Sequence, residues 1–348
     1  MLRATLPLVF LLACGAHETT LPVTTTAATD VGSSVANRVE MREYKVPTAD
    51  AFPHDVAVGP GGELWFTEER ANKIGRLDPA SGVFHEYTLE TPGAAPHGIA
   101  IDRAGDVWFT ANAKGFIGKL DPVKGLFTKY PLPERRASDP HSLAFDREGT
   151  LWFTVERAGM VGKLDPKTGE FALRPLVREN ALPYGVAIGK DGAPYVAEFG
   201  ANQIARVDPA TMEVREFPLP QAARPRRVAV APNGYLYFTD FARGKIGRLD
   251  TATGLVSEWS SPSGPRAQPY GLAITADGQV WYAETGPHPS RLVRFEPATQ
   301  RFASRAIPGG GVVRSMAATH DARLFFASSD GDRVLVATPG LGAVATRD

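Results

Sequence analysis

A short motif that begins with proline recurs at a nearly fixed interval along most of this 348-residue chain. Successive prolines lie 42–44 residues apart in six copies, at Pro53, Pro96, Pro140, Pro183, Pro225 and Pro269. A seventh, degenerate copy has Val313 in place of the proline. A fixed period of this size indicates a repeat architecture, in which one structural unit is copied along the chain.

Each repeat contains four short segments with the composition and alternation that are typical of strands. In the second repeat these segments cover residues 97–101, 106–110, 116–120 and 126–130. The chain has 35 glycines and 29 prolines, many of which mark the turns between the segments. No segment of useful length carries the 3.6-residue period of an amphipathic helix. The sequence therefore predicts four antiparallel strands per repeat, which is one blade of a β-propeller.

The two ends of the repeat region complement each other. The seventh repeat offers only three strand segments, around residues 315–317, 324–327 and 333–337, whereas residues 40–46 look like a single strand ahead of the first repeat. We expect this N-terminal strand to complete the last blade, because closing the ring removes the open sheet edges. The predicted fold is an all-β, seven-bladed β-propeller over residues 39–338, followed by a tail at 339–348.

One aromatic side chain occupies the same position in every repeat. The seven residues are Trp65, Trp108, Trp152, Tyr195, Tyr237, Trp281 and Phe325. Large rings at one repeat position are expected to fill the wedge between neighbouring twisted sheets. We therefore interpret them as core residues between blades and not as a surface on which a ligand stacks.

The first residues have the pattern of a secretory signal. Arg3 supplies a positive charge, and residues 6–13 form an apolar run that is too short to span a bilayer. The run ends in Leu-Ala-Cys-Gly, which resembles the bacterial lipobox, where cleavage leaves a lipidated cysteine. We expect a signal peptide over residues 1–13, lipidation of Cys14 and a flexible tether over residues 14–38. The alternative is an ordinary secretory signal with an incidental cysteine.

These features predict an extracytoplasmic protein that is held at a bacterial membrane by a lipid anchor, as a periplasmic or outer-membrane lipoprotein. Cys14 is the only cysteine, so an intrachain disulfide is excluded. The chain has 38 basic and 38 acidic side chains, and the zero net charge argues against nucleic acid as a partner. We expect a monomer.

Polar residues gather where the propeller would have its central channel. The residue after each proline should line the channel rim, because the first strand of a blade lies nearest the axis. These residues are His54, His97, His141, Tyr184, Arg226, Tyr270 and Arg314. A second set follows the aromatic position and should lie beside them: Glu68, Glu69, Asn112, Glu156, Glu198, Asp240, Glu284 and Ser328. Imidazoles and carboxylates on one concave site suit a metal centre or an acid–base pair, although any polar side chain can also solvate a channel mouth.

The repeat phrases resemble the virginiamycin B lyase (streptogramin lyase) family. The closest single match is Trp65-Phe66-Thr67-Glu68, which is followed by Asn-Lys-Ile-Gly-Arg-Leu at residues 72–77. The resemblance covers about residues 40–337. It implies a seven-bladed carbon–oxygen lyase that uses a divalent metal, usually Mg²⁺. It also implies a small cyclic ester or cyclic peptide as substrate, of the type B streptogramin kind, whose lactone ring opens by elimination.

The resemblance also implies roles for individual residues in the second and third repeats. His97 would contact substrate, Asp139 and Glu156 would hold the metal, and His141 would be the catalytic base. Apart from the resemblance, the rim position of five residues in other repeats would let them orient the substrate: His54, Tyr184, Arg226, Tyr270 and Arg314. The family has glutamate where this chain has Asp139, and it carries the constellation near its C-terminal end.

Two other functions fit the same sequence. Related propellers act as metal-dependent lactone hydrolases, which open a cyclic ester by adding water. The third reading is a non-catalytic lipoprotein that binds a ligand or a protein through its propeller face, because the fold alone does not determine activity.

Overall fold

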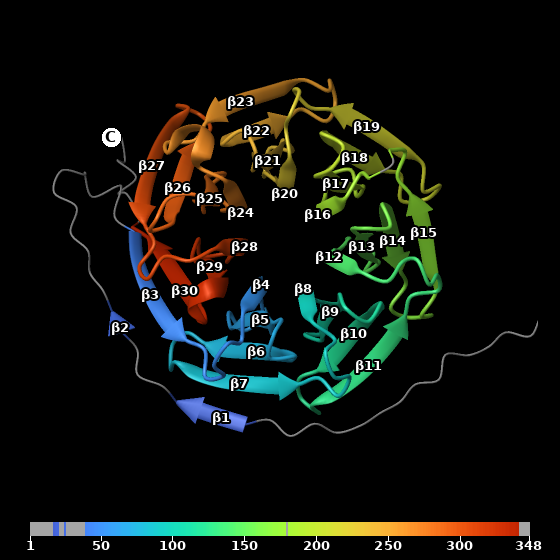
Figure 1. Ribbon diagram of the computed structural model, residues 1–348, viewed down its shortest axis with the longest axis vertical. Coiled ribbons are helices and arrows are strands. Elements are labelled where there is room, and N and C mark those ends of the chain that lie inside the picture. The colour runs from blue at the N-terminus through green and yellow to red at the C-terminus, as the bar shows by residue number, and fades with distance from the viewer. Residues whose placement is uncertain (1–16, 21–23, 26–38, 179, 341–348) are drawn as a thin grey trace, which may run out of the picture.

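Seven antiparallel sheets surround a central axis in the computed structural model, which describes residues 17–20, 24–25, 39–178 and 180–340 (Figure 1). The predicted seven-bladed β-propeller is therefore confirmed. The predicted signal peptide, Cys14, most of the tether and the last eight residues lie outside the described residues. Within the described part of the chain, no helix is long and apolar enough to cross a membrane.

The blades are numbered 1 to 7 in chain order, and each is given from its inner to its outer strand. Blade 1 contains β4 (Pro53–Val58), β5 (Leu64–Glu68), β6 (Lys73–Asp78) and β7 (Val83–Thr88). Blade 2 contains β8 (Pro96–Ile101), β9 (Val107–Ala111), β10 (Phe116–Asp121) and β11 (Leu126–Pro131). Blade 3 contains β12 (Pro140–Phe145), β13 (Leu151–Val155), β14 (Met160–Leu164) and β15 (Phe171–Pro175). Blade 4 contains β16 (Pro183–Ile188), β17 (Pro194–Glu198), β18 (Gln203–Val207) and β19 (Val214–Pro218).

The remaining blades follow the same order. Blade 5 contains β20 (Pro225–Val230), β21 (Leu236–Asp240), β22 (Lys245–Leu249) and β23 (Val256–Ser260). Blade 6 contains β24 (Pro269–Ile274), β25 (Val280–Glu284), β26 (Arg291–Glu296) and β27 (Arg301–Ala306). Blade 7 contains β28 (Val313–Ala318), β29 (Leu324–Ser328), β30 (Arg333–Pro339) and β3 (Val39–Lys45). In the described residues, short 3₁₀ turns lie at Gly264–Arg266 and Ser329–Gly331.

The ring is closed by the N-terminal strand. β3 pairs antiparallel with β30, in a register that runs from Val39 opposite Pro339 to Lys45 opposite Arg333. Two further short strands lie outside the ring: β1 (His17–Thr20) pairs with β7, and β2 (Thr24–Thr25) pairs with β3 (Figure 1). Blade 7 is thus assembled from both ends of the propeller.

The repeated aromatic residues lie between blades. Trp65 of blade 1 is 1% exposed and packs in a cluster with Ile99, Val107 and Phe109 of blade 2. Trp108 and Trp152 pack in the same way against the following blades. The core therefore consists of a series of wedges between neighbouring sheets, and burial of these large rings is a main source of its stability.

Each innermost strand carries a β-bulge just after its first residue. In blade 1, Pro53 pairs with Glu68 and Val56 pairs with Phe66, so two residues of β4 lie opposite one residue of β5. The same register shift occurs in all seven blades. A bulge re-aims the local side chains, and here it delivers two consecutive residues per blade, such as His54 and Asp55, to the central region.

A threonine of the second strand fixes several of these bulges and links them to the next blade. Thr154 Oγ1 accepts a hydrogen bond from the amide of Ser142 at 3.1 Å and donates one to the carbonyl of Tyr184 at 2.8 Å. Thr67, Thr110 and Thr239 make the equivalent pair of contacts. The channel residues are therefore held by the backbone of their own blade and of the neighbouring blade.

Candidate functional site

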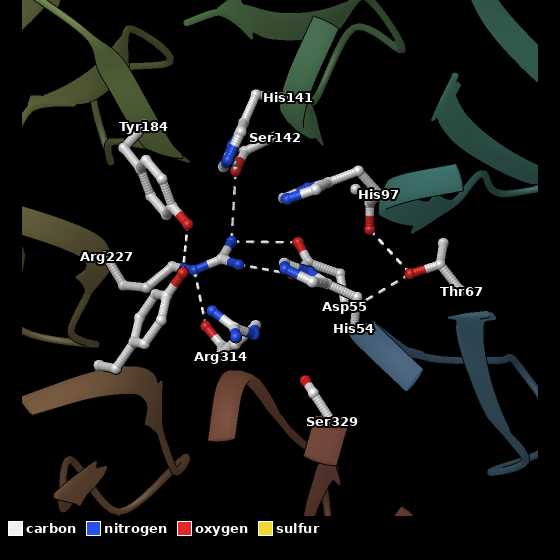
Figure 2. Close-up of polar contacts among 12 residues, drawn as sticks. His54, Asp55, Thr67, His97, His141, Ser142, Tyr184, Arg227, Arg314 and Ser329 are labelled. Carbon is white, nitrogen blue, oxygen red and sulfur yellow. Dashed lines mark hydrogen bonds and ion pairs between the residues drawn. The ribbon is translucent and has the colours of Figure 1, made fainter. Parts of the chain in front are cut away.

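Four predicted rim residues form a continuous arc at the centre of the ring. The rings of His54 and His97 lie 3.8 Å apart, His97 and His141 lie 4.0 Å apart, and His141 and Tyr184 lie 4.0 Å apart, measured between centroids. They come from the bulges of β4, β8, β12 and β16, and each is at most 7% exposed (Figure 2). The structure thus brings these four residues together from consecutive blades.

Burial sets the charge of the middle imidazoles. Burial, and after it the positive charge of neighbouring side chains, holds the pKa of His97 and of His141 well below the ordinary value. His97 Nδ1 is buried and has no hydrogen-bond partner. Both rings are therefore neutral near pH 7, which is the state that a proton acceptor needs.

The other half of the ring holds the predicted arginines and tyrosines. Arg226 lies over the rings of Phe241, Tyr270 and Phe199, at 4.0, 4.5 and 4.6 Å from their centroids. The hydroxyls of Tyr184 and Tyr270 form a hydrogen bond with each other. Arg314 lies over Phe52 at 5.2 Å and over Tyr270 at 5.8 Å. This half is therefore a cationic and aromatic surface, which suits an anionic or carbonyl-rich ligand.

An ion pair that the sequence analysis missed crosses the centre of the ring. Arg227 Nη2 lies 2.5 Å from Asp55 Oδ1, and Arg227 Nη1 lies 3.1 Å from Asp55 Oδ2 (Figure 2). Arg227 also donates to Ser142 Oγ at 3.3 Å and to the carbonyl of Arg314 at 2.9 Å. Burial alone would raise the pKa of Asp55, but the Arg227 charge and the contacts with His54 together outweigh it and hold that pKa below the ordinary value.

The sequence did contain a signal for this pair. Asp55 and Arg227 occupy the second position of the bulge, where the other five repeats have small residues: Gly98, Ser142, Gly185, Gly271 and Ser315. Two large side chains of opposite charge, at a repeat position that otherwise holds small residues, indicate an ion pair. The prediction overlooked them because regular alternation along a strand would point this position away from the residue before it.

The ion pair also decides which side chains suit a metal. In the described residues, His54, Asp55 and His97 offer ligand atoms that all lie within 4.8 Å of one another. Both carboxylate oxygens of Asp55 already face the Arg227 guanidinium, and His54 Nδ1 lies 3.0 Å from Asp55 Oδ1. Since a cation already occupies this carboxylate, the group does not fit a metal ion.

The carboxylates expected to hold a metal are Asp139 and Glu156, and with His141 they do not form a group of three ligand atoms within 4.8 Å of one another. Asp139 Oδ2 accepts a hydrogen bond from the amide of Arg157 at 2.7 Å, whereas Asp139 Oδ1 is buried without a partner. Burial raises the pKa of Asp139, and burial together with the Asp139 charge raises the pKa of Glu156. Two acids that repel each other beside an unpartnered oxygen are a donor set that a hard divalent cation would stabilise.

The expected base lies next to this acid pair. His141 Nε2 is 3.6 Å from Glu156 Oε2, and His141 Nδ1 is 3.1 Å from Ser142 Oγ. The Glu156 side chain is 27% exposed, so this edge of the imidazole lies at the solvent-facing side of the arc. An imidazole, two carboxylates and a partly open position are therefore present in blade 3.

The second set of predicted channel residues divides into two groups. Glu69, Asn112 and Glu156 follow the second strand by one residue and reach the arc: Glu69 Oε2 lies 3.8 Å from His54 Nε2, and Asn112 Nδ2 donates to the carbonyl of Pro140. The predicted channel residues that end the second strand do not lie beside the channel. They are Glu68, Glu198, Asp240, Glu284 and Ser328, all fully buried inside the blades. Alternation along the strand separates the two groups, because successive side chains face opposite ways.

Comparison with known proteins identifies a family for the chain. The sequence model of the virginiamycin B lyase family matches residues 11–292 and 169–340. The chain is 37% identical over 46 residues to the virginiamycin B lyase of Bacillus licheniformis, a match that spans 13% of this chain and 16% of that protein.

Solved structures extend the likeness over nearly the whole ring. The chain is similar to a streptogramin B lyase structure, with 27% identity and a TM-score of 0.81 over 88% of this chain and 99% of that one. A catalytically inactive histidine-to-alanine variant of virginiamycin B lyase from Staphylococcus aureus, solved with quinupristin, has the same fold, with 24% identity and a TM-score of 0.80 over 86% of this chain and 99% of that one. The chain belongs to the virginiamycin B lyase family.

Proposed function

We propose that the protein is a metal-dependent carbon–oxygen lyase that opens a small cyclic ester or depsipeptide by elimination. The observation that carries the proposal is the convergence in blade 3 of a neutral imidazole, His141, with the two repelling acids Asp139 and Glu156. Membership of the virginiamycin B lyase family supports the reaction class. The binding of quinupristin to a solved relative supports a streptogramin-like substrate.

His141 is the base in this proposal. Ser142 Oγ can accept hydrogen bonds from both His141 Nδ1 and Arg227 Nη1, which leaves the lone pair of Nε2 free. His141 Nε2 takes the proton alpha to the carbonyl of the ester-bearing residue. The C–H electrons form a carbon–carbon double bond, the C–O bond breaks and the carboxylate departs. Glu156 stabilises the imidazolium that results.

Asp139 and Glu156 would hold the divalent cation, with Mg²⁺ as the expected ion. When bound, such a cation polarises the ester carbonyl and stabilises the departing carboxylate. Asp139 offers Oδ1, the buried oxygen without a partner, while the amide of Arg157 fixes its other oxygen. The chain thus supplies one carboxylate that is already oriented and one that is partly exposed.

The remaining rim residues position the substrate. His97 is adjacent to His141 and carries an unpartnered Nδ1, so it offers a hydrogen bond beside the base. Arg226 and Arg314 each keep a buried Nε without a hydrogen-bond partner. These groups can bind carbonyl oxygens of a cyclic substrate, with Tyr184, Tyr270 and His54 forming the walls.

A specific observation favours the non-catalytic alternative, a propeller that binds a ligand or protein. The rings of His54, His97 and His141 already pack against one another, at most 7% exposed, as structural side chains do. The lactone hydrolase alternative uses the same carboxylates with water as the attacking group.

We also propose that the protein lies outside the cytoplasm, attached to a membrane by a lipid on Cys14. The apolar run at residues 6–13 and the Leu-Ala-Cys-Gly sequence at its end support this location.

One experiment separates these functions. The purified protein is incubated with a type B streptogramin, with and without EDTA, and the masses of the products are measured by mass spectrometry. The lyase gives a linear product of unchanged mass, and the product disappears with EDTA or with His141→Ala. His288→Ala, which removes an exposed histidine far along the chain from this site, is the matched control and keeps the activity.

The other outcomes are equally specific. A product that is heavier by one water identifies the hydrolase. Product formation that is insensitive to both EDTA and His141→Ala overturns the proposed site. A folded protein that binds the streptogramin and never converts it supports the binding alternative.

A further inference from the structure

Three polar residues recur at one place inside several blades. They are the last residue of the second strand, the residue five positions later that starts the third strand, and a residue 13 positions further on the outer strand. Blade 1 has Glu68, Lys73 and Glu86 at these positions, and blade 5 has Asp240, Lys245 and Glu258. The motif is thus two acids with an ammonium between them.

In these two blades the lysine contacts the acid of the outer strand, whereas both oxygens of Glu68 in blade 1 have no hydrogen-bond partner. In blade 1, Lys73 Nζ lies 2.8 Å from Glu86 Oε2. In blade 5, Lys245 Nζ lies 3.4 Å from Glu258 Oε2, and Arg243 Nε donates to Asp240 Oδ2 at 2.5 Å while its terminal nitrogens contact Glu258. A built-in positive charge therefore accompanies both pairs of acids.

Blade 4 keeps the two acids and lacks the cation. Its three positions hold Glu198, Gln203 and Glu216, and Ala201 stands where blade 5 has Arg243. The strand register places Glu198 opposite Gln203 and Gln203 opposite Pro218, so Glu216, two residues before Pro218, shares their face. The amide of Gln203 is neutral and offers an oxygen where the other two blades have an ammonium.

Four oxygens of this group are buried and have no hydrogen-bond partner: both carboxylate oxygens of Glu198, Glu216 Oε1 and Gln203 Oε1. Glu198 is fully buried and Gln203 is 6% exposed. Arg178 approaches only the remaining oxygen, with its Nε 3.7 Å from Glu216 Oε2, and its side chain is 63% exposed. Unpartnered buried oxygens are costly, and these four belong to side chains on one face of three adjacent strands.

We propose that Glu198, Gln203 and Glu216 of blade 4 bind a hard divalent cation, Ca²⁺ or Mg²⁺. Carboxylate and amide oxygens are the ligands that these ions prefer, and waters can complete the coordination shell. The cation takes the place of the ammonium in blades 1 and 5 and joins β17, β18 and β19. This is a structural site, separate from the acid pair Asp139 and Glu156 in blade 3. Burial and the Glu216 charge raise the pKa of Glu198 to about 8, as expected for a buried carboxylate beside a second acid.

The test uses the full chain with Asp139→Asn and Glu156→Gln, which removes the cation site proposed at the channel and so keeps the two proposals independent. Thermal unfolding and isothermal titration calorimetry are run with CaCl₂, with MgCl₂ and with EDTA. This parent binds one cation per chain and unfolds several degrees higher with the cation than in EDTA, because a ligand that binds only the folded state stabilises it.

Substitutions at one position then assign the site. Gln203→Lys restores the ammonium of blades 1 and 5, so it abolishes cation binding and raises the Tm in EDTA above that of the parent. Gln203→Met, of similar size without a polar end, weakens the cation effect and gives no such gain. Gln203→Glu adds a third carboxylate and tightens binding. In the chain with Asp139 and Glu156 intact, Gln203→Lys lowers the number of bound cations by one.

Three results would overturn the proposal. The parent shows no response of the Tm to Ca²⁺ or Mg²⁺, or Gln203→Lys responds as strongly as the parent does. The third result is a Tm that changes with pH near 8 and does not change with either cation. It would mean that Glu198 and Glu216 share a proton and bind no metal ion.

Discussion

Asp55 and Arg227, which are 172 residues apart in the sequence, form a bidentate ion pair across the centre of the ring. The pair connects the innermost strands of blades 1 and 5, and no strand pairing joins those blades. The Arg227 side chain continues to Ser142 Oγ in blade 3 and to the Arg314 carbonyl in blade 7. One guanidinium thus contacts three other blades, and its loss should affect both stability and the His141 environment.

Arg227→Met is expected to lower the free energy of unfolding by about 3–5 kcal/mol, because it leaves the buried Asp55 carboxylate unpaired. Urea denaturation monitored by tryptophan fluorescence measures the change. The double variant Arg227→Met with Asp55→Leu removes both charges and should recover most of the loss. A single variant within about 0.5 kcal/mol of wild type would contradict this account of the pair.

Glu68 makes stability depend on pH in the alkaline direction. Burial, and after it the Glu86 charge, raises the pKa of Glu68 from 4.5 to about 9. A carboxyl whose pKa is raised by folding gives full stability below the unfolded pKa, and that stability is lost as the pH rises toward the folded pKa. Between about pH 4.5 and 9, each pH unit costs at most about 1.4 kcal/mol for this group.

Glu68→Gln should therefore stabilise the protein at pH 8.5 and change it little at pH 5. Urea denaturation at the two pH values measures the difference. Glu90→Gln, at an exposed position, is the control and should show no such pH-dependent gain. An equal effect of Glu68→Gln at both pH values would show that the raised pKa is not the cause.

The threonine bridges between blades can be tested by exchange between repeats. Thr154→Val removes the hydroxyl that serves both the Ser142 amide and the Tyr184 carbonyl, at an expected cost of about 1–3 kcal/mol. Blade 4 has Ala197 at this position. Ala197→Thr can add the same bridge to blade 5, and it should be neutral or stabilising. Chemical denaturation compares both variants, and a cost for Thr154→Val below that of an exposed Thr→Val change would refute the bridge.

Ser142 is expected to act on catalysis by positioning His141. Ser142→Ala removes the oxygen at 3.1 Å from His141 Nδ1 and should lower kcat about tenfold with little change in KM. Ser142→Thr should restore most of the rate. Ser315→Ala, at the same repeat position in blade 7, is the control and should leave kcat unchanged. If Ser142→Ala changes KM and kcat together, or matches Ser315→Ala, the positioning role is refuted.

Cys14→Ala is expected to release the protein from the membrane, because it removes the proposed site of lipid attachment. Cell fractionation followed by immunoblotting measures the distribution. Cys14→Ala should move the protein from the membrane fraction to the soluble fraction, while Gly15→Ala should leave it at the membrane. Membrane association that persists in Cys14→Ala would contradict lipid anchoring.

The fold could be predicted from the sequence because each repeat carries the same marker residues at the same positions. The prolines fix where each inner strand starts, and the aromatic position fixes where each sheet packs on the next. The missing fourth strand of the last repeat and the isolated strand at residues 40–46 then predict the pairing observed between β3 and β30.

The site was only partly accessible, because its geometry depends on a bulge that the one-dimensional pattern conceals. The positions after the prolines correctly identified His54, His97 and His141 as neighbours. The bulge also turns Asp55 and Arg227 inward, which strict alternation does not predict. At the end of the second strand, the alternation of side chains does distinguish the two groups. Glu69 and Glu156 reach the arc, whereas Glu68 and Glu198 face the other way and are buried.

The pairing of β3 with β30 has a consequence for biogenesis. The first strand of the toroid finds its partner only after nearly the entire polypeptide has been synthesised, since Lys45 must meet Arg333. A chain without this pairing has unsatisfied backbone groups at the edge of its last blade, the kind of surface on which chains aggregate. A premature stop or a proteolytic cut that removes β3 or β30 would therefore leave the ring open, even if the other six blades are intact.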